Sequence, residues 1–340
     1  MKIHIIGSGI TGLTLGNLLN SKGINFNIYE KNNEFSKISS GIQIGSNAIA
    51  ILKKLKSFDK IDKLSIKTKK LNVFNNKLRK INQLDISNAD NQPSFFIRRS
   101  DLIKTLSAEI IRSKKIRFVE FERQKYADKH DIVVNCGGIQ HNKNSIPTKF
   151  LGIWGISNHT NKFFKELNLF MFSGMHFVSY PLTNNQTSFT IVLRKDLLSN
   201  DIDQVAIIKR LNEKFPEDLL RLINNAEHII TKEISYSSKT QWTSEACINI
   251  GDAAHHIAPH FAQGAAQGII DAYVLSSSLD NDISTAVKSL EMRTKFIDKL
   301  RYHSNLNRQI YHLGFPLNLY RDIFIKLFTP DYNWIFKKRL

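Results

Sequence analysis

The chain has 340 residues, of which 42 % are hydrophobic, and this is enough for a large core in one extended domain or two intertwined ones. It has no apolar run of about 18 residues, and its start, MKIHIIGSGI, lacks the pattern of a signal peptide, so we expect a cytoplasmic protein without a transmembrane helix. The net charge of +18 admits an anionic partner. The lysines are scattered, however, and no nucleic-acid-binding motif occurs, so no nucleic acid is expected.

The first thirty residues predict a strand, a glycine-rich turn, a helix and a second strand. KIHIIG is a short apolar strand, and the leucine-rich stretch that follows GSGITG predicts a helix that stops at Gly23. NFNIYE then predicts a second strand that ends at Glu30. This order is typical of a βαβ unit with a parallel sheet.

The turn in this unit has the pattern of a dinucleotide-binding site. Gly7, Gly9 and Gly12 give the tight turn, the close approach of a pyrophosphate to the backbone, and the close packing of helix on strand. The helix start then offers free N–H groups to phosphate. Glu30 lies where a carboxylate can accept hydrogen bonds from the ribose hydroxyls of an adenosine. The motif alone does not separate FAD from NAD.

The remaining chain alternates between sheet-like and helical stretches. A turn and a helix are expected after Gly41, and further helices are expected over 98–113, 203–225 and most of 282–340. Strands are expected over 67–97, 131–138, 150–195 and 246–250. Elements that could bind a ligand therefore recur at the start, middle and late parts of the chain, which favours two interleaved domains over two consecutive ones.

Residues 251–272, GDAAHHIAPHFAQGAAQGIIDA, are dense in groups that can hydrogen-bond a ligand. His256 and His260 are four residues apart, a spacing that a metal site on a helix would use, but Pro259 disfavours a helix through this stretch. Cys136 and Cys247 lie in apolar runs without metal-ligand spacing and are expected to pack in the core. No metal site is therefore predicted.

Three motifs together resemble the single-component FAD-dependent aromatic hydroxylases: GSGITG…YEK, RRSDL at 98–102, and the 251–272 stretch. GIQIGSNAIAILKKL and the tail motifs YHLGFPLNLYRD and DYNWIF look like the salicylate hydroxylase and 3-hydroxybenzoate 6-hydroxylase branch. The resemblance implies an α/β fold in which a Rossmann-like FAD-binding domain is interleaved with a smaller mixed-sheet substrate domain, followed by a helical C-terminus. The expected ranges are 1–66, 93–145 and 240–281 for the first domain, 67–92 and 146–239 for the second, and 282–340 for the C-terminal segment.

The resemblance also implies which residues hold the flavin. Asp252 would bond the ribityl hydroxyls, and the backbone around Gly264 and Ala265 would lie beside the isoalloxazine ring. A helix that begins near Gly264 would direct its positive end at the part of the flavin that becomes negative on reduction. Arg99 matches a family arginine that contacts the cofactor, while its neighbour Arg98 is the alternative that the sequence leaves open.

The implied chemistry is monooxygenation of a small phenol or aromatic acid. NADH or NADPH reduces the flavin, dioxygen adds to give a flavin hydroperoxide, and this species hydroxylates the ring. HFVSYPL resembles a family strand, which makes His176 the candidate base for the phenol and Tyr180 a pocket residue. Gln263 is a candidate catalytic residue that holds the substrate or a hydrogen-bond relay, with a role in backbone positioning as the alternative.

Three positions depart from the family pattern. Gly137 and Asn144 stand where an Asp-Gly motif and its arginine are usual, and Gly155 stands where the family has an arginine. The first two changes concern nicotinamide recognition as well as FAD. A trimmed enzyme and a non-catalytic FAD-binding protein both fit these changes, and a membrane-associated hydroxylase of a quinone precursor is a third alternative. The tail around 313–328 is expected to pack as a core helix rather than to lie on lipid. A monomer or a homodimer is expected.

Overall fold

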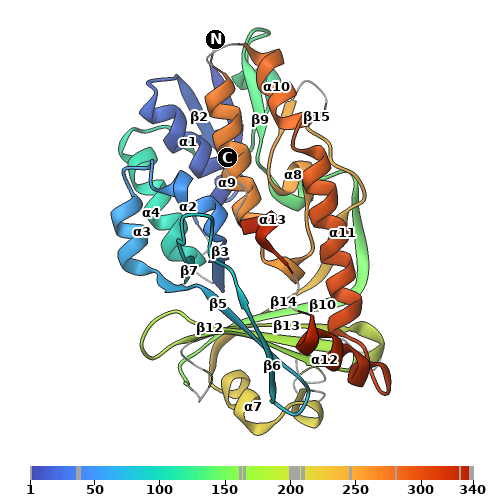
Figure 1. Cartoon of the computed structure of the whole chain (residues 1–340). Helices are drawn as coiled ribbons and strands as arrows, with labels where there is room; N and C mark the ends of the chain where they lie inside the picture. Colours follow the sequence, from blue (N-terminus) through green and yellow to red (C-terminus); the bar gives the residue numbers. More distant parts are fainter. Residues whose placement is uncertain are drawn as a thin grey trace.

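The computed structural model describes residues 2–35, 40–160, 163, 166–198, 207, 211–244, 247–279, 282–328 and 331–336. Figure 1 shows two layered bodies: a parallel sheet with its helices, and below it a broad antiparallel sheet. Strands of the parallel sheet come from 3–29, 116–135 and 243–249, whereas those of the antiparallel sheet come from 70–85 and 145–237. The chain therefore passes between the two bodies more than once. This confirms the predicted α/β fold with interleaved parts, while the exact domain boundaries remain a prediction.

The parallel sheet carries the glycine-rich turn. Its strands run parallel except β15 at one edge, and β1 lies between β9 and β2 with Ile5 paired to Val134 and to Ile28. The central strands β1, β2 and β9 are short and almost fully buried, as expected for strands with helices on both faces. The sheet order is β15 (Thr243–Ser244), β16 (Cys247–Asn249), β9 (Ile132–Asn135), β1 (Ile3–Ile6), β2 (Phe26–Tyr29) and β8 (Ile116–Arg117).

The helices of this body pack on the sheet through one large apolar cluster. Leu13 and Leu15 of α1 are fully buried there, together with Ile269 of α9 and Leu106 of α4. The helices are α1 (Ile10–Ser21), α2 (Ser46–Leu52), α3 (Phe58–Leu64), α4 (Arg99–Arg112), α5 (Arg123–Tyr126), α8 (Asp252–His255), α9 (Gly264–Ser278) and α10 (Ile283–Glu291).

The larger antiparallel sheet supplies a wall for the candidate site. Among its described strands only β11 and β5 pair in parallel, and β12 and β13 pair through Phe177 and Ile191. The helix α7 (Glu217–Asn224) covers one face through Leu219 and Leu222. The sheet order is β14 (Ala226–Ser237), β10 (Ser145–Ser157), β13 (Thr187–Arg194), β12 (Met175–Pro181), β11 (Leu167–Phe172), β5 (Lys70–Phe74) and β6 (Lys80–Asp85).

A small third sheet corrects one expectation. The stretch predicted as a turn after Gly41 is a strand, β3 (Gly41–Ile44), because its backbone pairs with β7 (Ser94–Arg98), which also pairs with β4 (Ile66–Thr68). The helix expected after it is α2. The helix predicted over 203–225 yields α7 and helical residues 211–214, whereas 203–206 and 208–210 lie outside the described residues.

The C-terminal part is helical, as predicted: α11 (Thr294–Tyr311), α12 (Leu317–Leu327) and α13 (Asn333–Phe336). Figure 1 shows α11 running from the helical body to the antiparallel sheet, where α12 follows. In the part of the chain that the structure describes, no helix combines the length and apolar character needed to cross a membrane.

Candidate active site

The glycine-rich turn holds β1 and α1 in close contact. Gly7 has a φ of +94°, and a Cβ there would lie 2.7 Å from the carbonyl oxygen of Cys136. A Cβ on Gly12 would lie 2.1 Å from the carbonyl oxygen of Gly7, so only glycine fits. At Gly9, the residue that precedes α1, a Cβ would meet nothing within 4 Å. The turn therefore leaves the N-terminus of α1 open on the side where a phosphate would approach.

Glu30 lies against this turn, directly after β2. Its Oε2 accepts hydrogen bonds from the backbone N–H and the hydroxyl of Ser8 at 3.1 and 2.7 Å, and its Oε1 accepts from Asn32. Burial raises the pKa of Glu30, but the hydrogen bonds from Ser8 and Asn32 outweigh this effect and lower it. Glu30 is therefore an anion with acceptor capacity to spare, because an ionised carboxylate offers about four lone-pair sites.

Thr11 joins the turn to the 251–272 stretch. Its hydroxyl oxygen lies 2.7 Å from the position that a Cβ on Gly251 would take, and 2.2 Å from that of a Cβ on Gly268. Gly251 also has a φ of +63°. These two glycines let the start of α1, the loop before α8 and the helix α9 approach one another, so the open end of α1 and Asp252 belong to one site.

Asp252 begins α8 and faces the N-terminus of α9. Its Oδ1 is 3.6 Å from the position of a Cβ on Gly264 and 3.4 Å from Nδ1 of His256. The Asp252 side chain is 43 % exposed, but the protein around its carboxylate excludes part of the solvent, and this desolvation raises its pKa. His256, His255 and Arg99 together lower the pKa below its ordinary value. An anion at the positive end of a helix is the arrangement that electrostatics favours.

The sequence did not decide whether Arg98 or Arg99 contacts the cofactor, and the two side chains have different surroundings in the structure. The guanidinium of Arg98 contacts the carboxylate of Glu227 on β14, with Nη2 and Oε1 3.2 Å apart. Arg99 is the exposed first residue of α4, and its charge acts on Asp252. Arg98 thus has the role of a structural ion pair, and Arg99 is the arginine on the side of the predicted flavin site.

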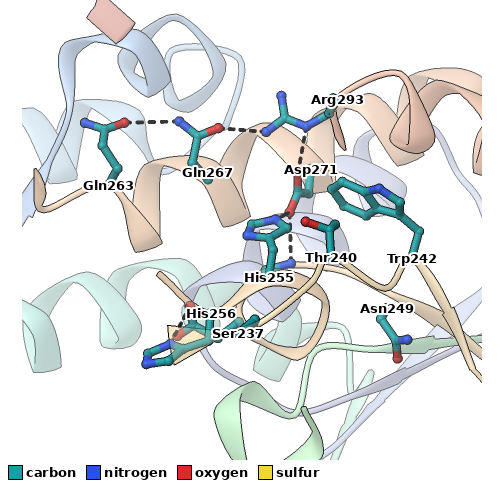
Figure 2. A network of polar contacts seen from close by, with 12 residues as sticks. Ser237, Thr240, Trp242, Asn249, His255, His256, Gln263, Gln267, Asp271 and Arg293 are labelled. Carbon is teal, nitrogen blue, oxygen red and sulfur yellow. Dashed lines mark hydrogen bonds and ion pairs between the residues drawn. The ribbon is translucent and has the colours of Figure 1, made fainter. Parts of the chain in front are cut away.

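Behind α8, a buried carboxylate ties the loop to α9 (Figure 2). Asp271 is fully buried and accepts hydrogen bonds from the backbone N–H of Gly251 at 2.9 Å, Nε2 of His255 at 2.6 Å and Nε of Arg293 at 2.9 Å. Burial raises its pKa, but His255 and Arg293 outweigh this effect and lower it. Asp271 therefore stabilises the loop as a satisfied buried anion. Asp271 was not among the predicted site residues, although it lies within the 251–272 stretch.

The same network continues to Gln263. Arg293 donates to Gln267 Oε1 at 2.8 Å, and Gln267 donates to Gln263 Oε1 at 3.1 Å (Figure 2). Asn47 donates to the same oxygen of Gln263 at 3.0 Å. Gln263 is 1 % exposed, and its side chain is not among the residues that line the cavity described below. Its catalytic role remains a prediction, and this position favours the alternative that Gln263 positions the backbone at the start of α9.

A cavity of about 250 Å³ lies between the antiparallel sheet and the N-terminal end of α9. Asp252, Gly264 and Ala265 line one part, and His176 and Tyr180 of β12 line another. The predicted flavin-side and substrate-side residues therefore border one space. The other lining residues are Gly41, Ile42, Gln43, Leu71, Ile86, Trp154, Leu167, Leu169, Val178, Thr190, His256, Ile257, Pro259, His260, Phe261, Ala262, Tyr311, Tyr332 and Phe336.

Three buried histidines meet on the substrate side. His176 Nδ1 lies 2.7 Å from Nε2 of His312, and the ring centres of His176 and His260 are 5.4 Å apart. Burial lowers the pKa of His176 to about 3, and burial, then the neighbouring charges, lowers those of His260 and His312. All three are neutral near pH 7. Neither ring nitrogen of His260 has a hydrogen-bond partner among the described residues, so this ring can bond a ligand.

His260 and His312 were not assigned to the substrate by sequence analysis. His260 lay in the quoted loop, and His312 lay in the tail motif YHLGFPLNLYRD, which was read only as a family resemblance. Among the described residues, no group of three or more histidine, cysteine, aspartate or glutamate side chains is arranged to hold a metal ion.

Comparison with known proteins agrees with this geometry. The sequence profile of a family described as an FAD binding domain matches residues 1–124. Monooxygenase 1 of Arabidopsis thaliana is 25 % identical over 320 residues, covering 82 % of this chain and 78 % of the relative. The aurachin C monooxygenase/isomerase of Stigmatella aurantiaca is 23 % identical over 318 residues, covering 82 % and 80 %. Klebsiella pneumoniae HpxO, solved with FAD and uric acid, superposes with a TM-score of 0.80 at 16 % identity over 96 % of this chain and 92 % of that chain.

Over most of its length the chain is similar to FAD-dependent monooxygenases, and its first 124 residues match an FAD binding domain. The site fits the cofactor on the evidence of its own residues. The end of α1 is open at Gly9, Glu30 is anionic beside it, and the carboxylate of Asp252 faces the cavity at the start of α9. The salicylate hydroxylase branch is not distinguished by these comparisons.

The departures from the monooxygenase pattern have structural causes. A Cβ on Gly137 would lie 2.5 Å from the ring of His141, so this imidazole takes the space that a larger side chain would need. Asn144 donates to Gln241 at 2.7 Å, and a Cβ on Gly155 would lie 2.3 Å from the ring of Phe189. Each replacement is therefore packed into its surroundings.

Asn142, which sequence analysis did not single out, links this segment to the flavin side. It donates to the carbonyl oxygen of Asp252 at 2.8 Å and to the hydroxyl of Ser237 at 2.6 Å. The segment that replaces the Asp-Gly motif thus still supports α8, and with it the position of Asp252.

Proposed function

We propose that this monooxygenase hydroxylates a small ring compound that carries a neutral hydroxyl or a keto and N–H pair, bound in the cavity beside FAD. The observation that carries the proposal is the shared cavity, with Gly264 and Ala265 at one wall and His176 and His260 at another. The overall reaction consumes one dioxygen and one NADH or NADPH with a proton. One oxygen atom enters the ring, and the other leaves as water.

FAD would be held by the residues of the flavin side. The pyrophosphate would lie at the N-terminus of α1 over Gly7, Gly9 and Gly12, with the adenosine ribose at Glu30. Asp252 would accept hydrogen bonds from the ribityl chain, and Arg99 would add a positive charge near it. When bound and reduced, the flavin supplies the activated oxygen for transfer to the ring.

The chain's own residues would bind and orient the substrate. His176 uses Nδ1 for its contact with His312, which leaves Nε2 for a ligand. With its pKa lowered to about 3, this imidazole is too weak a base to take the proton of a phenol, but it can accept a hydrogen bond from a ring hydroxyl, which makes the ring richer in electrons and more reactive toward an electrophile. Burial raises the pKa of Tyr180 to about 12 in spite of its hydrogen bond with Ser188, so its phenol stays protonated at the cavity wall.

The lining favours a phenol or hydroxylated heteroaromatic ring over an aromatic acid. Among the described residues around the cavity there is no lysine or arginine, and the carboxylate of Asp252 would repel a second anion. An aromatic carboxylate would lose its hydration there without an ion-pair partner. The solved HpxO structure contains uric acid, and the Stigmatella relative is named for aurachin C, which supports a ring compound.

Product identification tests the proposal. The purified protein is first checked for bound FAD by its visible spectrum. It is then supplied with NADH or NADPH, ¹⁸O₂ and a panel of phenols, hydroxyquinolines and benzoic acids. The expected result is one labelled oxygen in a hydroxylated phenol or hydroxyquinoline. Hydrogen peroxide with every compound and no labelled product would show a flavin-binding protein without this activity. A labelled benzoic acid alone would contradict the proposed substrate class.

A further inference from the structure

The helix α12 has the opposite polarity from that of an ordinary surface helix. Its buried residues are Asn318, Arg321 and Ile325, of which two are polar. Its outer face is apolar, with Tyr320 69 % and Leu327 69 % exposed. The expectation that this tail packs as a core helix is therefore wrong for most of its apolar side chains. The exposed large apolar residues from this helix and its flanks are Phe315, Leu317, Leu319, Tyr320, Ile323, Phe324, Leu327 and Phe328; we call them the α12 patch.

The inner face fixes this orientation. Arg321 is 5 % exposed and donates through Nη1 to the backbone carbonyl of Tyr311 at 3.2 Å. Its Nε and Nη2 bond Asp322 at 2.9 and 2.8 Å. Asn82 of β6 donates to the carbonyl of Ile325. A rotation of the helix that buried its apolar face would break the bonds to Tyr311 and from Asn82 and would expose the apolar Ile325, so the α12 patch is held outward.

Positive charge surrounds the α12 patch. Lys326 lies on the helix itself, and the neighbouring β5–β6 hairpin carries the exposed Lys77, Arg79 and Lys80. Figure 1 shows this hairpin beside α12 at the lower edge of the molecule. The acidic residue of the helix, Asp322, is neutralised by Arg321. An apolar helix face with a basic rim matches the chemistry of an anionic lipid surface.

We infer that the α12 patch docks the protein on an anionic phospholipid membrane, with its apolar side chains in the headgroup boundary and the basic rim against lipid phosphates. A second copy of the chain is the less suitable occupant. Two chains of net charge +18 repel one another, and each would bring the same basic rim to a shared interface.

Docking at this face would place the membrane next to the cavity wall. Ile325 packs in an apolar cluster with Leu169 and Tyr311, and both of these line the cavity. One layer of side chains therefore separates the docked helix from the substrate space. The substrate class follows if the proposed function holds, and this inference rests on it. The ring compound that binds in the cavity would be lipid-soluble and would enter from the membrane.

Vesicle flotation of the full chain tests the docking. The probes are phosphatidylcholine vesicles with and without about 30 % phosphatidylglycerol. We expect flotation with the anionic vesicles, lost at about 0.5 M salt because the rim charges are screened. A Phe324→Ser/Leu327→Ser variant should float about tenfold less. Met292→Ser is the matched control, because Met292 is 78 % exposed and precedes the N-terminus of α11 whereas α12 follows its C-terminus.

Two further readouts separate the possible failures. Flavin content and NAD(P)H oxidation without vesicles report the proposed function independently of docking. Equal flotation of the wild type and the double variant, or no flotation of either, would overturn the inference. Light scattering that shows a dimer in the wild type and a monomer in the double variant, without flotation, would assign the α12 patch to self-association instead.

Discussion

The predicted flavin site and the substrate side of the cavity are built on different physical principles. The flavin side consists of glycine-dependent backbone contacts and carboxylates whose pKa values stay low, namely those of Glu30, Asp252 and Asp271. The substrate side consists of neutral imidazoles in an apolar wall, with the pKa of His176 lowered to about 3. The flavin side therefore provides fixed charge and exact backbone geometry, which suits a large polar cofactor. The substrate side provides uncharged hydrogen-bonding groups, which suit a small uncharged ring that is oriented and activated by hydrogen bonds.

Steric changes on the flavin side are expected to reduce stability and FAD binding most strongly. Gly12→Ala places a Cβ 2.1 Å from the backbone oxygen of Gly7, and that atom cannot move without shifting β1. We expect a loss of about 3 kcal/mol or more in the free energy of unfolding, and loss of FAD. Gly9→Ala is the matched control, because its Cβ meets no protein atom.

Denaturant unfolding and the flavin absorbance distinguish the two variants. Gly9→Ala should fold with nearly wild-type stability and yet bind FAD less tightly, since the new methyl group obstructs the approach of the pyrophosphate. Wild-type FAD affinity in Gly9→Ala would remove the turn from the proposed cofactor site.

An effect of similar size is expected at Asp271. Asp271→Ala leaves the largely buried guanidinium of Arg293 without its anion, which we expect to cost about 3–5 kcal/mol of unfolding free energy. Asp282→Ala, at the exposed start of α10, is the control and should cost far less. Because the pKa of Asp271 is lowered on folding, its stabilisation is present above about pH 4 and is lost as the pH falls further. Equal losses in both variants would show that Asp271 is not a structural anion.

The same contrast explains which parts could be predicted from the sequence. Gly7, Gly9, Gly12 and Glu30 lie close together in the chain, and their roles follow from local backbone geometry. The contact between His176 and His312 joins residues 136 positions apart, and no local pattern encodes it.

Two errors have the same origin. The strand Gly41–Ile44 forms because β7 pairs with it, which a glycine-rich local sequence does not show. In α12 the apolar spacing predicts a buried face, but the tertiary bonds of Arg321 turn that face outward. Periodicity identifies the helix, and only the surrounding fold determines which face is buried.

On the substrate side, the largest effect should be kinetic. His176→Ala removes the proposed hydrogen-bond acceptor, and we expect hydroxylation of the best panel substrate to slow by about 10–100-fold. FAD content and stability should change little compared with that loss. His130→Ala, at an exposed turn, is the control. Product formation per NAD(P)H consumed is the measurement, and parallel loss of FAD would instead give His176 a structural role.

The neutral histidines also predict how stability depends on pH. In the unfolded chain a histidine has a pKa of about 6.5, whereas burial lowers that of His176 to about 3. Between these values the unfolded chain binds protons that the folded chain does not, so the free energy of unfolding should rise with pH across this window. His260 contributes in the same direction, and it faces His176, His312 and the charge of Arg308. Denaturation at a series of pH values gives the slope of the unfolding free energy against pH, which should be shallower for His260→Gln than for the wild type. An unchanged slope would show that the His260 ring is solvated in the folded protein.

The smallest effects are expected at Arg98 and Arg99. Their alanine variants test whether FAD binding depends on the position of the positive charge. Arg98→Ala breaks an ion pair at the surface with Glu227 and should cost about 0.2–1 kcal/mol of stability, without changing FAD affinity. Arg99→Ala should leave stability nearly unchanged but weaken FAD binding severalfold, because the positive charge that lowers the pKa of Asp252 is lost.

Titration of the apoprotein of each variant with FAD, at low and at high salt, measures the change in affinity. If the charge of Arg99 acts on the bound cofactor, its effect should shrink as salt screens it. If Arg98→Ala weakened FAD binding and Arg99→Ala did not, the ion pair between Arg98 and Glu227 would have to open when FAD binds.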